Sequence, residues 1–299
     1  MIVDTETHPL IFARPSATNP AWSMVKHYTW HEHSPELLIA EMDQAGVEKA
    51  FMISYDAEDV LWDAESKGLS LEDFAGGPKY CRRGLAKFPD RFWWFNTVKN
   101  PAKHDAAALV HADLKDGAAG IKLLPAYIRC DLTGKGLAAV FREVERARAR
   151  VLISLQTLRP PQTPTHEAYL NELGDILARY PSTNFALMQG GCIDPLDSRA
   201  RVVFELLRRH PNLFLSTAQV GEIWDDHTEY PFPNYLRRIA KLVNEVGAHR
   251  LMWATDWPWF EDKFKYQQSV DSIRKHADFM TEMDKAMFLG GTAEHFMRP

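Results

Sequence analysis

The chain has 299 residues, of which 45% are hydrophobic and 25% are charged, a balance typical of a globular protein that excludes intrinsic disorder, collagen-like repeats and a coiled coil. Its 35 Lys and Arg residues against 40 Asp and Glu residues give a formal net charge of −5, which argues against a nucleic-acid-binding protein because no basic face is evident. The three cysteines form no CxxC pair, so the sequence indicates neither a disulfide framework nor a cysteine-based zinc site.

Apolar segments of strand length recur along the chain and alternate with segments of helical period. Several of the strand segments are continuously apolar, as is typical of parallel strands that are covered on both faces. In chain order, the predicted strands are Ile2–Thr5, Lys49–Ser54, Phe92–Val98, Gly120–Leu124, Val151–Gln156, Phe185–Gln189, Leu213–Thr217 and Leu251–Thr255. The predicted helices that stand out are Ser34–Ala45, Leu137–Arg150, Glu167–Tyr180, Arg199–His210 and Tyr235–Val246.

Eight strands, each followed by helical sequence, predict an α/β protein with a (β/α)8 TIM barrel, as a single domain over residues 1–299. An open, doubly wound sheet is the alternative, because the sequence does not show whether the sheet closes. The N-terminus lacks the pattern of a signal peptide, and no apolar run reaches the roughly 18 residues of a membrane span. We therefore expect a cytoplasmic protein that does not contact membranes.

The connections that follow strands are often long, notably Pro9–His33, Tyr55–Lys79, Ala218–Asn234 and Trp257–Tyr266. In TIM barrels the chemistry is carried by these loops, so we expect the functional site on their side of the barrel. Aromatic residues in the loops predict either a lid that packs on the barrel or a pocket for a small organic substrate, and they leave a homodimer open. These residues are Trp22, Tyr28, Trp30, Trp224, Tyr230, Phe232, Trp257, Trp259 and Phe260.

Ionisable residues stand where the first and the last predicted strand end. Glu6 and His8 are two residues apart, so in an extended chain their side chains point to the same side. Asp256 follows an apolar run, and a carboxylate there needs a cation, a strong hydrogen-bond donor or the barrel opening. The first and last strands of a closed barrel are neighbours, so the three residues would converge as ligands of a divalent metal ion.

The chain resembles the amidohydrolase superfamily, and within it the amidohydrolase-related branch that contains metal-dependent hydrolases, lactone hydrolases and aromatic-acid decarboxylases. The matching segments span nearly the whole chain: VDTETHP, SPELLIAEMDQAGVEKAFMIS, GIKLLP, MWATDWPW and FLGGTAEHF. The resemblance implies a distorted TIM barrel and places Glu6, His8 and Asp256 at metal-ligand or catalytic positions. The Glu-x-His order resembles the decarboxylase members, whereas Thr292 stands where the family usually has Asn.

Two positions depart from the family pattern. The family normally has a metal-binding His at the end of the fifth strand and a catalytic or metal-proximal His at the end of the sixth, where this chain has Gln156 and Gln189. A glutamine cannot exchange a proton near neutral pH. Gln156 can still ligate a metal ion through its oxygen, and Gln189 can orient a substrate or water. A single divalent ion (Zn, Mn or Mg) and no metal at all therefore both stay open.

The sequence also offers several candidate residues for substrate binding. Lys122 is either a side chain that reaches solvent from a strand end or a cation for a substrate carboxylate. Arg159 is either a second carboxylate-binding cation or a solvated loop residue. His31 belongs to a Trp-His-Glu-His segment in the first long loop, and it is either a residue of a lid or a substrate contact, rather than a metal ligand. His227 is a candidate for proton transfer, a role that Gln189 cannot fill.

The sequence therefore predicts an enzyme that binds a small molecule. The first hypothesis is a hydrolase of a small carboxylated lactone, ester or amide, in which Asp256 activates water. The second is a non-oxidative decarboxylase of a hydroxylated aromatic acid. The third is a barrel that has lost turnover and serves as a binding module.

Overall fold

A parallel sheet of eight strands forms the centre of the protein. The computed structural model describes residues 1–12, 32–54, 74–75, 77–155, 166–218, 229–259 and 264–298. Its strands lie side by side in the order β1-β4-β6-β7-β8-β9-β10-β11. Their bounds are β1 Val3–Thr7, β4 Lys49–Ile53, β6 Phe92–Thr97, β7 Gly120–Leu123, β8 Arg150–Ile153, β9 Phe185–Leu187, β10 Leu213–Ser216 and β11 Leu251–Met252. This order is that of consecutive βα units.

The sheet closes between its first and last strands. The backbone N–H of Thr5 donates to the carbonyl of Trp253 at 3.1 Å. Farther along, the N–H of His8 donates to the carbonyl of Trp257 at 2.7 Å, and Thr7 and Trp257 form a parallel bridge. The predicted TIM barrel is therefore confirmed, and the open-sheet alternative is wrong.

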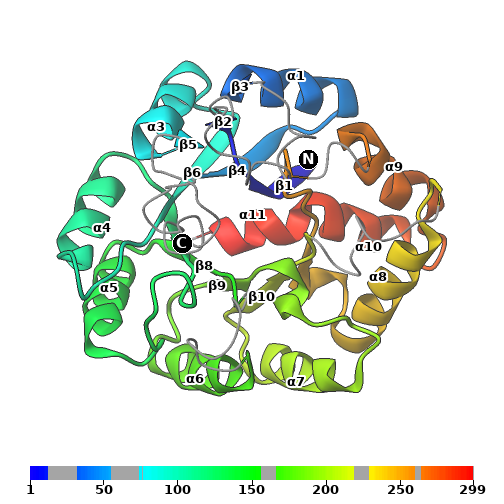
Figure 1. Cartoon of the computed structure of the whole chain (residues 1–299). Coiled ribbons are helices and arrows are strands. Elements are labelled where there is room, and N and C mark those ends of the chain that lie inside the picture. Colours follow the sequence, from blue (N-terminus) through cyan, green and yellow to red (C-terminus); the bar gives the residue numbers. More distant parts are fainter. Residues whose placement is uncertain are drawn as a thin grey trace, which may run out of the picture.

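Helices surround the strands in a ring (Figure 1). Their bounds are α1 Pro35–Ala45, α3 Pro78–Lys87, α4 Ala106–Lys115, α5 Lys135–Arg146, α6 His166–Arg179, α7 Arg201–Arg209, α8 Pro233–Val246, α9 Tyr266–His276, α10 Glu282–Ala286 and α11 Thr292–Met297. Shorter helical turns are η3 Gln189–Cys192, η4 Ser198–Ala200, η5 Ala248–Arg250 and η6 Met287–Gly291. Helix α11 runs across the middle of the ring.

Local sequence signals set some helix ends, and tertiary pairing sets others. Helix α1 begins as predicted, because the Ser34 hydroxyl accepts the N–H of Leu37 at 3.1 Å, and it ends at Gly46 with φ +73°. The predicted helix to Arg150 is wrong at its end, since α5 stops at Arg146 and Arg150 is the first residue of β8. Parallel pairing with β7 and β9 overrides the helical period there.

The barrel interior is filled by apolar side chains and covered by α11. Val3, Phe51 and Met252 belong to an interior cluster that also contains Ala293 and Phe296 of α11. The guanidinium of Arg150, at the start of β8, donates to the Phe296 carbonyl at 2.9 Å. Helix α11 therefore lies at the N-terminal ends of the strands, which leaves their C-terminal ends as the face for chemistry.

The N-terminus passes closely over η6, and this contact requires a glycine. A Cβ added to Gly290 would lie 2.1 Å from the Met1 carbonyl oxygen, which belongs to the backbone. We expect Gly290→Ala to lower the free energy of unfolding by about 1–3 kcal/mol, because the backbone must shift. Gly174→Ala is the control: its Cβ would meet only a Leu206 methyl at 3.4 Å, and helix propensity favours it. Urea unfolding of both variants checks this, and equal stabilities would contradict it.

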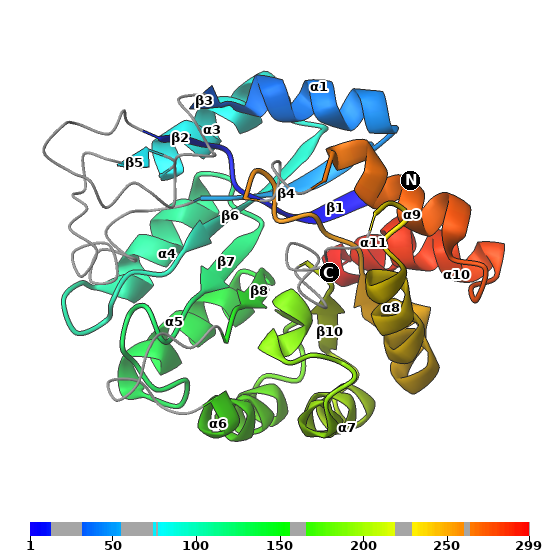
Figure 2. The same cartoon turned by 45° about the vertical axis from the view of Figure 1, so that its right-hand side comes forward.

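A second, small sheet lies beyond the C-terminal ends of the barrel strands. Its strands β2 Leu10–Phe12, β3 Glu32–His33 and β5 Phe74–Ala75 are antiparallel, in the order β3-β2-β5. Figure 2 shows it on the side of the barrel opposite α10 and α11. The sequence predicts only long loops in these regions, and the sheet shows that the first two loops pair with each other.

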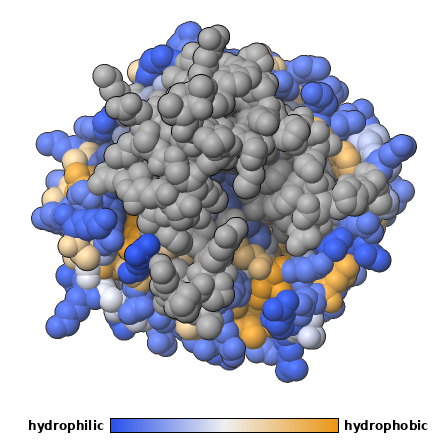
Figure 3. Space-filling model, viewed as in Figure 1, coloured by the Kyte–Doolittle hydropathy of each residue, from blue (hydrophilic) through white to orange (hydrophobic). Residues whose placement is uncertain are grey.

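The described surface carries few large apolar side chains. The rim of the face in Figure 3 is mostly hydrophilic. Large apolar residues exposed by a third or more are Met1, Leu37, Leu109, Leu196, Val202, Tyr230, Phe279 and Met283. Among the described helices, none combines the length and the apolar composition that a membrane crossing requires. The homodimer stays a prediction.

Candidate active site

A β-bulge in β1 turns Glu6 and His8 toward the barrel axis. Along β1, Asp4 pairs with Ala50 and Thr7 with Met52, so β1 has one more residue than β4 between these pairs. An extra residue reverses the alternation of faces, and bulges of this kind re-aim side chains beside functional sites. Val3 points into the interior cluster, and the bulge lets Glu6 point inward as well, where it meets Lys122.

Asp256 reaches the same place from a turn after β11. Its φ of +59° is left-handed, which is uncommon for a residue other than glycine. Its backbone N–H donates to the Glu6 carbonyl at 2.9 Å, so the turn is tied to the bulged strand. Strained backbone of this kind is found at functional sites, where surrounding contacts hold it in place.

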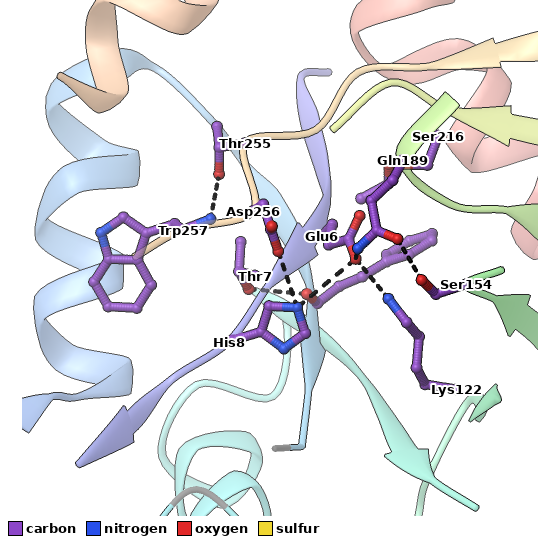
Figure 4. Close-up of polar contacts among 12 residues, drawn as sticks. Glu6, Thr7, His8, Lys122, Ser154, Gln189, Ser216, Thr255, Asp256 and Trp257 are labelled. Atoms are coloured by element: carbon purple, nitrogen blue, oxygen red, sulfur yellow. Dashed lines mark hydrogen bonds and ion pairs between the residues drawn. The ribbon is translucent and has the colours of Figure 1, made fainter. Parts of the chain in front are cut away.

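The structure brings Glu6, His8 and Asp256 together (Figure 4). His8 Nε2 lies 3.2 Å from Asp256 Oδ1 and 3.7 Å from Glu6 Oε1. One ligand atom of each residue lies within 4.8 Å of the others, and all three residues are buried. The site is therefore a compact cluster at the C-terminal ends of β1 and β11.

One oxygen of Glu6 is held by two donors, and the other has none. Lys122 Nζ donates to Glu6 Oε1 at 2.5 Å, and Gln189 Nε2 donates to the same oxygen at 3.1 Å. Among the residues that the structure describes, no hydrogen-bond donor meets Glu6 Oε2. A buried carboxylate oxygen without a donor is costly, so it suits a cation or a ligand that supplies the missing contact.

Gln189 is oriented by its neighbours. The Ser154 hydroxyl donates to Gln189 Oε1, and the Cys192 thiol lies 3.8 Å from the same atom. This fixes Oε1 toward those two residues and the amide NH2 group toward Glu6. Gln189 and Cys192 both have positive φ values, 53° and 59°, in the η3 turn after β9. Ser154 is a site residue that the sequence reasoning missed, because its partner Gln189 is 35 positions away, in the η3 turn.

Burial and neighbouring groups raise the pKa values of Asp256 and His8 and lower the pKa of Glu6. Burial raises the pKa of Asp256, and the charge of Glu6 raises it further. Burial would also raise the pKa of Glu6, but Lys122 and His8 outweigh it and hold that pKa below its ordinary value. Burial lowers the pKa of His8, whereas hydrogen bonding to Asp256 and Glu6 raises it above its ordinary value overall. At neutral pH, Glu6 is charged and His8 holds a proton more firmly than a free imidazole does.

A third carboxylate, which the sequence reasoning missed, lies behind the site. Asp4 is fully buried and accepts hydrogen bonds from Thr255 and Tyr266. Burial raises the pKa of Asp4 to about 7, although these donors lower it. The available signal was a charged residue directly after the apolar pair Ile2 and Val3 in the first predicted strand, because a carboxylate buried there must find several donors.

The comparisons with known proteins agree with this fold. The family model described as amidohydrolase matches residues 3–298. The chain belongs to the amidohydrolase family. A comparison with curated proteins gave no significant match for the chain.

Solved structures similar to this chain include an amidohydrolase from Burkholderia multivorans with bound zinc, at TM-score 0.70 and 13% identity, with 99% of each chain covered. A probable 2-pyrone-4,6-dicarboxylic acid hydrolase from Acinetobacter baumannii, with citric acid bound, has TM-score 0.66 and 14% identity, with 99% of this chain and 98% of that one covered. A 5-carboxyvanillate decarboxylase from Novosphingobium aromaticivorans, complexed with manganese and a nitrobenzoic acid, has TM-score 0.62 and 17% identity, with 99% and 96% covered. At these identities the likeness establishes the fold.

The remaining predicted site residues of the chain are placed unequally. Lys122 is 2% exposed and paired with Glu6, so the reading of it as a side chain that reaches solvent is wrong. His33 is buried, with its ring edge-to-face with Trp257 at 5.5 Å. Predicted residues that lie outside the described part of the chain are Gln156, Arg159, His31, His227, Trp22, Tyr28, Trp30, Trp224 and Phe260.

The cluster of Glu6, His8 and Asp256 fits a divalent metal ion. Glu6, His8 and Asp256 offer two carboxylates and an imidazole, which are ligands that Zn and Mn accept. The donor-free Glu6 Oε2 is the observation that favours an ion, because an ion would supply its missing contact. The opposing feature is the proton of His8, which an ion must displace to bind the imidazole.

Metal binding by this cluster is therefore expected to depend on pH. Because the pKa of His8 is raised, protons compete with the ion, and affinity should rise by about tenfold per pH unit for each proton displaced. Titration calorimetry with Mn²⁺ at pH 6, 7 and 8 measures this. His8→Ala should lose binding, whereas His276→Gln, on the exposed end of α9, should keep it. Affinity that does not change with pH would contradict the expectation.

Proposed function

We propose that the protein is a hydrolase of a small carboxylated lactone, ester or amide, and that Asp256 takes a proton from the attacking water. The observation that carries the proposal is the buried cluster of Glu6, His8 and Asp256 at the C-terminal ends of the strands. An effective general base has a pKa near the operating pH, and the pKa of Asp256 is raised toward that range.

The chain's own residues supply the other parts of such a reaction. When Asp256 accepts a proton from water, His8 Nε2, at 3.2 Å from Asp256 Oδ1, can stabilise the carboxyl group and help return the proton to the leaving group. Lys122 has three N–H groups and the Gln189 amide has two, and each uses one on Glu6. Within the described part of the chain the remaining donors have no other acceptor, and we propose that they bind the carbonyl oxygen of a substrate, where negative charge develops.

A divalent ion would be held by Glu6, His8 and Asp256, with Gln156 as a further proposed ligand. When bound, such an ion supplies Lewis-acid polarisation of a carbonyl and lowers the pKa of water. Arg159, His31 and His227 remain proposed substrate contacts. In a metal-free enzyme, Lys122 and the imidazole of His8, whose pKa is raised above its ordinary value, would offset the negative charge of the two carboxylates.

The experiment is a substrate panel in ¹⁸O-labelled water, run with and without a chelator. Small carboxylated lactones, esters and amides are incubated with the protein, and the products are analysed by mass spectrometry. Hydrolysis predicts a new carboxylic acid that carries one oxygen from water. Absence of turnover across the panel would overturn the proposal, and loss of turnover on chelation would assign the metal-dependent form.

A non-oxidative decarboxylase is the second candidate. It is favoured by Glu6, which stands two residues before His8 and is kept charged by Lys122, in the Glu-x-His order that resembles the decarboxylase members. In this reaction Asp256 would deliver a proton to the ring carbon as carbon dioxide leaves. Hydroxylated aromatic acids test it. In D2O, decarboxylation predicts carbon dioxide and one deuterium on the ring of the product. In ¹⁸O-labelled water, it predicts an aromatic product without ¹⁸O.

A further inference from the structure

We propose that Asp4 is a positioning residue, and that its carboxylate fixes the positions of Glu6 and Asp256 relative to each other. Its Oδ1 atom accepts the backbone N–H of Glu6 at 3.2 Å and the backbone N–H of Thr255 at 3.0 Å. Glu6 is one of the two site acids, and Thr255 directly precedes the other, Asp256. One oxygen atom therefore joins the backbones that carry the two acids.

The second oxygen of Asp4 extends this network to a helix. Its Oδ2 atom accepts the Thr255 hydroxyl at 2.6 Å and the Tyr266 hydroxyl at 2.9 Å. Tyr266 is the first residue of α9 and is 5% exposed, while Asp4 is fully buried. Four donors from three segments of the chain thus converge on one side chain that solvent does not reach.

The backbone at these points needs such a partner because it is irregular. The bulge in β1 interrupts the ladder with β4 between Asp4 and Thr7, and Asp256 has a left-handed φ. Regular strand pairing does not fix either conformation, so side-chain hydrogen bonds add to the backbone bond between the Asp256 N–H and the Glu6 carbonyl. In addition, the Thr255 hydroxyl accepts the Trp257 N–H at 3.1 Å, which links the turn to the residue that pairs with β1.

Asp4 acts through these backbones rather than on a substrate. Its four hydrogen bonds end on Glu6, Thr255 and Tyr266, and none of them involves the side chains of Glu6, His8 or Asp256. The expected consequence of weakening this network is a shift in the distance between the two acids, with a loss in the rate of the chemical step. A shift of about 1 Å can lower turnover about 100-fold.

The test compares two variants that each lose one tyrosine hydroxyl group. Tyr266→Phe removes one donor to Asp4, whereas Tyr235→Phe removes a buried hydroxyl of α8 that bonds Thr217 instead. Crystal structures of both, together with Asp4→Asn if it folds, give the positions of the site side chains without any substrate. We expect the Asp256 turn to move relative to β1 in Tyr266→Phe and to superpose on the wild type in Tyr235→Phe.

The effect on turnover rests on the proposed function, and the crystallographic result does not. With a substrate in hand, kcat of Tyr266→Phe should fall about tenfold at nearly unchanged KM, while both Phe variants lose a similar amount of thermal stability. If the site side chains superpose in all variants, or if both Phe variants lose kcat equally, the inference is overturned. If no substrate is found but the turn moves only when the Asp4 network is cut, the inference stands and the proposed function fails.

Discussion

The Asp256→Asn protein is expected to lose about 10³-fold in turnover and to remain folded, because an amide cannot accept a proton from water. Its stability should equal or exceed that of the wild type. Burial and the charge of Glu6 both disfavour the Asp256 carboxylate, and the substitution removes that penalty. Steady-state kinetics and thermal unfolding on the same preparation measure the two effects.

Asp271→Asn is the matched control, since this carboxylate lies on α9 and pairs with Arg274 and Lys275 outside the site. It should keep its activity. The pH profile of the wild type supplies an independent check on Asp256. A general base must be deprotonated, so kcat/KM should fall as the pH drops through a pKa above the ordinary 3.8 of an aspartate. Residual activity above a tenth in Asp256→Asn would refute its role as the base.

Lys122→Met is expected to lower the free energy of unfolding by about 3–5 kcal/mol at neutral pH, because it leaves the buried Glu6 carboxylate without its cation. The double variant Lys122→Met/Glu6→Gln should recover most of this loss, since no buried charge remains. Chemical unfolding of the four proteins in this cycle measures the coupling between the two residues.

The pH dependence follows from the shifted pKa of Glu6. In the wild type this pKa lies below its ordinary 4.5, so the ion pair stabilises the fold above that value and is lost as the pH falls through the lower, folded-state pKa. In Lys122→Met, burial raises the pKa instead, so protonation relieves the cost as the pH drops. The difference in the free energy of unfolding between the wild type and Lys122→Met should therefore decrease as the pH falls.

An exposed ion pair provides the control for the Lys122 result. Lys241 and Glu245 lie on α8 at i and i+4, with side chains 41% and 26% exposed. Lys241→Met should change stability by less than about 1 kcal/mol, because solvent screens this pair. If Lys122→Met costs no more than Lys241→Met, the Lys122–Glu6 pair does not stabilise the site as we infer.

The sequence pattern predicts the barrel because that pattern is local. Continuous apolar runs and helical periods are read within about 10 residues, and the Ser34 cap and Gly46 stop mark α1 correctly. It fails where neighbouring strands decide the outcome, as at Arg150, where pairing begins a strand inside the predicted helix. The sequence pattern also does not predict the sheet of β2, β3 and β5. Its strands are only two or three residues long, so they form through pairing with each other and show no periodicity of their own.

The site could be predicted in part. The spacing of Glu6 and His8, with Asp256 at the other end of the chain, indicates convergence once the barrel closes. The sequence does not indicate that Lys122 Nζ binds Glu6, because the two residues are 116 positions apart. Nor does it indicate that Asp4 accepts hydrogen bonds from Thr255, 251 positions away.

By itself, the sequence determined the eight-strand rhythm, the end of the barrel that carries chemistry and the residue types at the strand ends. Only the tertiary structure decided which way those residues point. A single extra residue in β1 reverses the faces of the strand, and this is visible only against the register of β4. The register and the side-chain partners depend on contacts between distant segments, which the local periodicity of a chain does not encode.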